Sequence, residues 1–82
     1  MTRELAQLTR AYRLSSTGEG RQIREESGIS LRLLARTIGV NQGELSRWER
    51  GVARPRPGSA VRWLRAVDTI RTELDRVRGH SA

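Results

Sequence analysis

Two short helical patterns separated by only three residues constrain the fold of this chain more than any other feature. The first pattern spans residues 31–38, the second spans about residues 42–50, and Gly39-Val40-Asn41 lies between them. So short a connection makes the two helices cross at a steep angle, and the residue nearest the crossing must be small, as Ala35 is. The turn also requires a positive backbone angle, which only glycine adopts at little cost, and Gly39 meets that requirement. The segment therefore predicts two crossed helices joined by a tight turn.

Polar capping residues and glycines divide the rest of the chain into further helices. A first helix is expected from Thr2 to about Leu14, followed by a polar linker over residues 15–20 and a second helix over about residues 19–27. In the helix after the turn, Glu44 stands three residues after the cap and completes a capping-box pattern. The residues expected to cap or stop the helices are Thr2, Gly28, Ser30, Gly39, Asn41 and Gly51.

A long last helix is predicted over about residues 59–78, which contain no glycine or proline. Its apolar side chains recur at alternating spacings of three and four, which is typical of a coiled coil. These side chains are Ala60, Trp63, Val67, Ile70, Leu74 and Val77. We expect the first half of the helix, with Val61 and Leu64, to pack on the crossed pair.

The second half of this helix has two candidate partners. One is the N-terminal helix, whose apolar stripe consists of Leu5, Leu8 and Tyr12. The other is a second copy of the chain, in a homodimer formed through Val67, Ile70, Leu74 and Val77. A separate helix capped by Asp68 is a further alternative, which the continuous stripe disfavours.

No alternating strand pattern occurs, so the predicted fold is all-α. We expect a compact helical bundle around the crossed pair, with an extra N-terminal helix and a long C-terminal helix. Residues 1–82 form one domain, comprising the N-terminal helix (residues 1–15), the crossed helices with a basic loop (residues 19–58) and the C-terminal helix (residues 59–78).

Composition argues against catalytic and metal chemistry. A chain of 82 residues builds a small core with little volume for an enclosed pocket. It has no cysteine, and its one histidine, His80, lies in a C-terminal tail that we expect to be frayed. No set of nucleophile and base and no cluster of metal ligands is present in the sequence. We therefore expect no enzyme activity, no cofactor, no metal and no small-molecule ligand.

The charge instead points to a polyanionic partner. Sixteen arginines against nine acidic residues give a net charge of +7, and there is no lysine. Residues 31–58 hold six of the arginines and only two glutamates, so most of the excess lies there. Nucleic acid is the first candidate and an anionic membrane surface the second. No apolar run approaches the roughly 20 residues of a membrane span, and residues 1–4 lack the character of a signal peptide, so we expect a cytoplasmic protein.

Residues 31–50, LRLLARTIGVNQGELSRWER, resemble the Cro and phage-repressor helix-turn-helix family. The resemblance covers about residues 21–67. It includes the small residue and glycine at positions 35 and 39, the run Ser46-Arg47-Trp48-Glu49-Arg50-Gly51 and the loop Arg54-Pro55-Arg56-Pro57. The apolar spacing also agrees, through Leu34, Ile38, Val40, Leu45 and Trp48. The resemblance implies that the helix after the turn enters the DNA major groove, N-terminal end first, while the preceding helix rests on the phosphate backbone.

The resemblance assigns roles to individual residues. Base-reading positions are Asn41, Gln42, Gly43 and Arg47. Gln42 can bond the edge of adenine and Arg47 that of guanine, whereas Gly43 departs from the family pattern because a reading side chain often stands there. Contacts to phosphate or the minor groove fall to Arg32, Arg36, Ser46, Arg50, Arg54 and Arg56.

Two further residues, Arg24 and Glu49, are expected to form a partly buried structural ion pair, because family members often pair a basic residue at the first position with an acid at the second. Trp48 is expected in the core, since its spacing from Leu45 turns it away from DNA.

The predicted function is that of a sequence-specific regulator of transcription binding double-stranded DNA, a phage or bacterial Cro-like protein or repressor. The alternative is an antitoxin-like or adaptor module that acts through protein contacts of its terminal helices.

Overall fold

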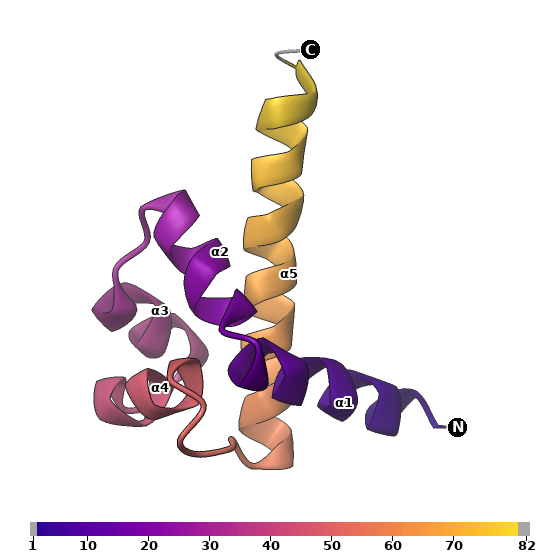
Figure 1. Ribbon diagram of the computed structural model, residues 1–82, viewed down its shortest axis with the longest axis vertical. Helices are drawn as coiled ribbons and strands as arrows, with labels where there is room; N and C mark the ends of the chain where they lie inside the picture. Colours follow the sequence, from indigo (N-terminus) through magenta and orange to yellow (C-terminus); the bar gives the residue numbers. More distant parts are fainter. Residues whose placement is uncertain (1, 81–82) are drawn as a thin grey trace.

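Five α-helices connected by short loops make up the part of the chain that the computed structural model describes, residues 2–80 (Figure 1). They are α1 (Arg3–Ser16), α2 (Glu19–Ser27), α3 (Leu31–Ile38), α4 (Gln42–Glu49) and α5 (Pro57–His80). No strand occurs within residues 2–80, so the all-α prediction is confirmed. The last two residues of the expected tail, 81 and 82, lie outside the described residues.

Three helices begin at the predicted polar caps. The side-chain oxygens of Thr2, Ser30 and Asn41 each accept a hydrogen bond from a backbone N–H in the first turn that follows. The prediction of a capping box at the start of α4 is wrong. Asn41 Oδ1 accepts from the N–H of Gly43 at 2.7 Å, one residue short of the bond that a capping box requires, and within residues 2–80 the exposed Glu44 makes no hydrogen bond back.

Two predicted helix boundaries differ from those in the structure. Residues 15–20 are not a polar linker, because α1 continues to Ser16 and both Ser15 and Gly20 are buried. The last helix begins at Pro57, a residue that suits the first helical position, and it continues without a break through Asp68 to His80. The alternative of a separate helix capped by Asp68 is therefore wrong.

The core surrounds the first half of α5. Trp63 and Val67 are fully buried there, and the ring of Trp63 packs against that of Trp48 with the centroids 5.6 Å apart. From α1, Ala11 and Leu14 are buried in the same cluster. Figure 1 shows α5 as the longest element, with α1 crossing its lower half and α2 beside its middle.

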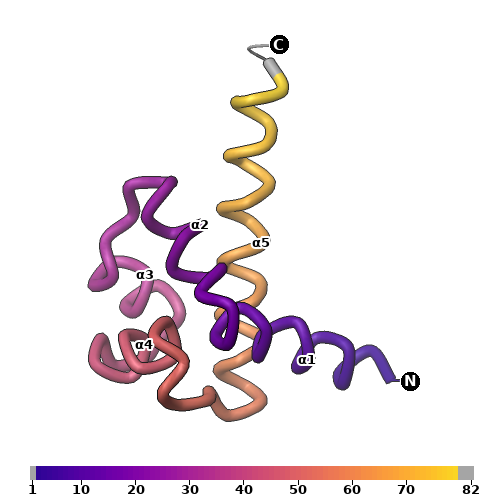
Figure 2. The backbone as a smooth tube through the Cα atoms, viewed as in Figure 1, coloured from indigo at the N-terminus to yellow at the C-terminus, as the bar shows by residue number. Residues whose placement is uncertain are grey.

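The second half of α5 lies along α2 rather than along α1. Arg71 pairs with Glu19 of α2, and Arg78 pairs with Glu26. Of the N-terminal stripe, Leu5 is 53% exposed, whereas Leu8 and Tyr12 are partly buried against the core. Figure 2 shows the last turns of α5 extending beyond the end of α2.

This arrangement corrects the residues expected in a homodimer. Val67 is fully buried and Ile70 is only 9% exposed, so both belong to the core of a single chain and are not free for a partner. Leu74 is partly buried, and Val77 is 67% exposed. Of the predicted stripe, only the last two side chains remain accessible.

Candidate nucleic-acid interface

The crossing of α3 and α4 sets the geometry of the candidate interface. Gly39 has a φ of 74°, and Ala35 is 2% exposed where the two helices approach. The N–H of Val40 donates to the carbonyl of Ala35 at 2.9 Å and closes the turn. Leu45 and Trp48 then bury one face of α4, so the opposite face of this helix points to solvent.

The four predicted base-reading residues lie together on that solvent-facing side. Asn41, Gln42, Gly43 and Arg47 are all exposed. The structure also suggests why Gly43 departs from the family pattern. A Cβ at this position would lie 3.0 Å from Asn41 Oδ1, the atom that caps the helix. Glycine at position 43 therefore leaves room for the Asn41 side chain that caps the exposed N-terminus of α4.

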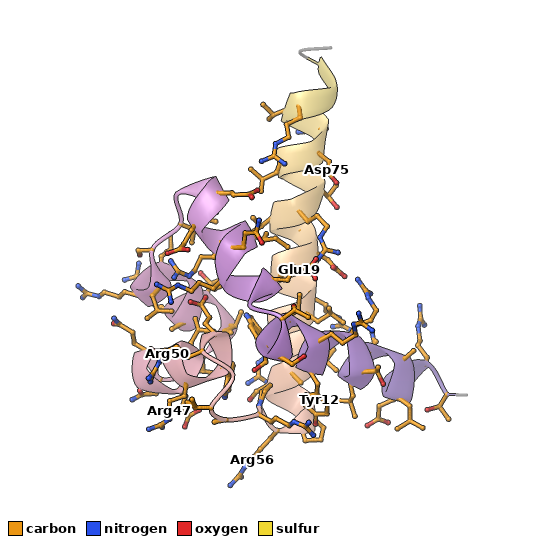
Figure 3. The ribbon with its side chains drawn as sticks, viewed as in Figure 1. Tyr12, Glu19, Arg47, Arg50, Arg56 and Asp75 are labelled. Carbon is orange, nitrogen blue, oxygen red and sulfur yellow. The ribbon has the colours of Figure 1, made fainter. Side chains whose placement is uncertain are left out.

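The predicted phosphate contacts extend from α3 to the loop before α5. Arg32, Arg36, Arg50, Arg54 and Arg56 are exposed, while Ser46 is partly buried. Figure 3 shows Arg47 and Arg50 on the α4 side of the molecule and Arg56 pointing away from its body. The structure thus places Arg47 and all of the predicted phosphate arginines at the surface, on or beside the crossed helices.

Ion pairing separates these arginines from most of the others. Among the described residues, all seven salt bridges use arginines of α1, α2 or α5. None involves the six arginines of the crossed helices and the loop, which are Arg32, Arg36, Arg47, Arg50, Arg54 and Arg56. Their positive charge is therefore not neutralised within the described chain, and this surface attracts anions.

Arg54 has a different contact. Its guanidinium carbon lies 5.1 Å from the centroid of the Tyr12 ring, within the range of a cation–π interaction. Arg54 also lines a hollow of about 470 Å³ between α4 and the loop. Arg47 and Arg56 line the same hollow, together with Glu44 and Ser59.

Arg24 and Glu49 meet beneath this surface. Arg24 Nε donates to Glu49 Oε2 at 2.7 Å and Arg24 Nη2 to Oε1 at 2.9 Å, so the contact is bidentate. Arg24 Nη1 also donates to the carbonyl of Ile29. The hydrogen bond to Glu49 raises the pKa of Arg24, although burial acts in the opposite direction. The pair joins α2 to the end of α4 and leaves neither group available to DNA.

Two contacts that the sequence did not predict hold the crossed helices in place. Ser15 Oγ donates to the carbonyl of Trp48 at 2.6 Å and ties α1 to α4. Arg62 Nε donates to the carbonyl of Ile38 at 3.0 Å and satisfies the end of α3. Both pairs are distant in sequence, and no local spacing or composition signals them.

The described residues contain no group of three or more histidine, cysteine, aspartate or glutamate side chains that could hold a metal ion. No helix within the same range is long and apolar enough to cross a membrane.

The crossed helices α3 and α4, the exposed face of α4 and the surrounding arginines without salt bridges are typical of a DNA-binding helix-turn-helix protein. A family model described as helix-turn-helix matches residues 21–73, more than half of the chain. The chain belongs to this family, the Cro and phage-repressor type, whose members are DNA-binding regulators of transcription. No curated protein and no solved structure matches the chain. Helix α1 lies entirely outside the matched residues, although Trp48 and Arg54, which it contacts, lie within them.

Proposed function

We propose that this protein is a sequence-specific regulator that binds double-stranded DNA, a Cro-like protein or repressor of a phage or bacterium. The supporting observation is the surface of six arginines without carboxylate partners around the exposed face of α4. In this proposal α4 enters the major groove, where Gln42 and Arg47 read base edges. Arg32 and Arg36 of α3, with Arg50, Arg54 and Arg56, hold the phosphate backbone on either side.

The test is footprinting of the purified protein on DNA from its own genomic neighbourhood, followed by affinity measurement at physiological salt. We expect protection of one short duplex, bound about 10³-fold or more tightly than random DNA. Equal affinity for the protected duplex and for random duplexes would contradict sequence-specific regulation.

An adaptor or antitoxin-like module is the second candidate. Two adjoining apolar hollows, of about 310 and 400 Å³, lie where the end of α2 and α3 meet α5, and both are lined by Ile29, Thr69 and Ile70. Leu33, at the rim of the first, is 43% exposed. Such a surface suits a protein partner, and indifferent DNA binding combined with tight protein binding would favour this candidate.

The proposed regulator acts as a homodimer through the last turns of α5. Leu74 and Val77 line the second hollow, and Val77 is largely exposed in a single chain. A single recognition helix reads few base pairs, whereas two copies read half-sites about one DNA turn, roughly 34 Å, apart. A second copy would also remove the exposed Val77 from water.

Val77→Glu tests the dimer with little risk to the fold, because the side chain is exposed in the monomer. Analytical ultracentrifugation with and without the operator should show two chains for the parent and one for the variant. Leu5→Glu, which places the same charge on a largely exposed apolar side chain of α1, is the control. A parent that remains a monomer on a single half-site would refute the dimer.

A further inference from the structure

Helix α1 contacts the side of the molecule that carries the candidate interface at two points, although all of it lies outside the family match. The Tyr12 ring lies beneath Arg54 of the loop, and Ser15 bonds the end of α4. Gly51, which follows α4, also approaches Ser15. A Cβ built on Gly51 would lie 3.3 Å from the Ser15 carbonyl oxygen. The end of α1 is thus packed against the segment where α4 passes into the arginine–proline loop.

The Tyr12 contact is the one that involves a charged group of the interface. Tyr12 is partly buried and packs against the core, so the position of its ring is determined by the fold. Arg54 is exposed and, among the described residues, has no hydrogen bond or ion pair. The ring of Tyr12 is therefore the feature that restrains an otherwise freely rotating guanidinium.

The place where Arg54 is held is the rim of the hollow between α4 and the loop. Arg47 of α4 and Arg56 of the loop line the same hollow, and Pro55 between the two loop arginines is buried. Each of these three arginines offers several N–H donors, so a tetrahedral oxyanion that entered the hollow would have arginine donors on more than one side. Glu44 is the one carboxylate that lines it.

We propose that α1 is a working part of the DNA interface, in which Tyr12 positions Arg54 so that this hollow receives one phosphate of the DNA backbone. The proposal rests on the DNA binding proposed above and adds a positioning residue to it. Fixing the guanidinium before binding removes part of the side-chain entropy that the contact would otherwise lose. A helix outside the family match would thereby increase the affinity of the matched helices for DNA.

A double-mutant cycle on the full chain tests the proposal. Tyr12→Leu keeps the apolar packing but removes the ring, and it should weaken operator binding about two- to five-fold, the range expected for an exposed cation–π contact. Tyr12→Phe keeps the ring and should bind as the parent does. In an Arg54→Ala background, Tyr12→Leu should cause no further loss, because the group that it positions is absent.

Two additional measurements separate positioning from general packing. Ile23→Ala, a change at a buried core position on α2, should lower the melting temperature without altering operator affinity. In the nuclear magnetic resonance spectrum of the free protein, the Arg54 Cδ protons should be shifted upfield by the ring, and Tyr12→Leu should abolish this shift. The spectrum of the parent alone thus tests the contact even if Tyr12→Leu does not fold.

The outcomes are distinguishable from those of the proposed function. Equal losses from Tyr12→Leu with and without Arg54 would overturn the positioning role while leaving DNA binding intact. If the Arg54 Cδ protons of the parent show no upfield shift, the positioning role is likewise overturned and DNA binding is unaffected. A parent that binds no duplex would overturn the proposed function and this inference together.

Discussion

Arg24 and Glu49 illustrate how a charged pair can serve the fold rather than the ligand. Their side chains are 12% and 3% exposed, respectively, and the bidentate contact spans 25 positions of sequence. A pair so placed adds little net stability over apolar residues, but breaking it leaves a buried charge without compensation. The resemblance to the family predicted their pairing, and the structure brings the two side chains together.

Arg24→Ala should therefore lower the free energy of unfolding by about 3–5 kcal/mol, because Glu49 loses its partner in the interior. Urea denaturation measures the effect. The matched control is Arg21→Ala, which removes a pair with Glu25 whose side chains are 53% and 54% exposed. That control should cost less than about 1 kcal/mol. Similar losses for both variants would show that burial does not distinguish the two pairs.

Gly20 is limited by packing rather than by backbone conformation. A Cβ at this position would lie 2.7 Å from Cζ2 of Trp63, a side chain with no exposed surface into which to move. Gly20→Ala should destabilise the protein by about 1–3 kcal/mol, as overpacking of a core does. Gly58→Ala is the control, since its Cβ would meet only an arginine side-chain nitrogen at 3.8 Å. Thermal unfolding that ranks the two variants equally would contradict the contact.

At the scale of elements, α3 and α4 cannot be stable alone. Each has eight residues, whereas isolated helices shorter than about 12–15 residues are marginal in water. Caps at Ser30 and Asn41 begin them, and the contacts from Ser15 and Arg62 hold their ends. Helix α4 is thus held in place by contacts from α1 as well as by its own cap, and α3 by a contact from α5.

The exposed face of α4 leads to a prediction about specificity. Gln42→Ala and Arg47→Ala should each cost about 1–3 kcal/mol of binding to the preferred duplex and relax the preference at one base pair. Affinity measured across a set of single-base operator variants gives both the loss of binding free energy and the change in base preference. Because both side chains are exposed, the melting temperature should not change. Two variants that bind as tightly as the parent would remove these residues from base reading.

At the scale of the whole molecule, charge is divided between two regions. The acidic residues that form ion pairs neutralise arginines of α1, α2 and α5, and the arginines around α3, α4 and the loop have no such partners among the described residues. We therefore expect a polyanion to be attracted to the side of the molecule that carries α3, α4 and the loop.

The salt dependence of binding tests this division. Arg36→Ala or Arg50→Ala should weaken binding to every duplex and reduce the slope of log K against log salt by about one unit each. Arg71→Ala removes an equal charge that is paired with Glu19 on the α2–α5 side, and it should leave the slope close to that of the parent. A reduction as large for Arg71 as for Arg36 would mean that net charge alone governs binding.

The sequence by itself determined the helical segments and the face of α4. Caps, glycine turns and the three-residue spacing of Leu45 and Trp48 are local properties, because each depends on backbone geometry within one or two turns. They therefore predicted the helix starts, the tight turn at Gly39 and the all-α class. The match to the helix-turn-helix family depends on the same short-range pattern.

Tertiary structure alone decided which surface each amphipathic helix meets. An apolar stripe predicts that one face of a helix will be buried, but it does not identify the surface that covers this face. The stripe of α5 could therefore have packed on α1, on a second chain or on the crossed helices. The fold buries Val67 and Ile70 in the chain's own core and lays the following turns along α2. The contact of Tyr12 with Arg54 joins residues 42 positions apart and, like the burial of Ser15, exists only once the helices have packed. Such long-range contacts depend on how whole helices fit together, which no local pattern encodes.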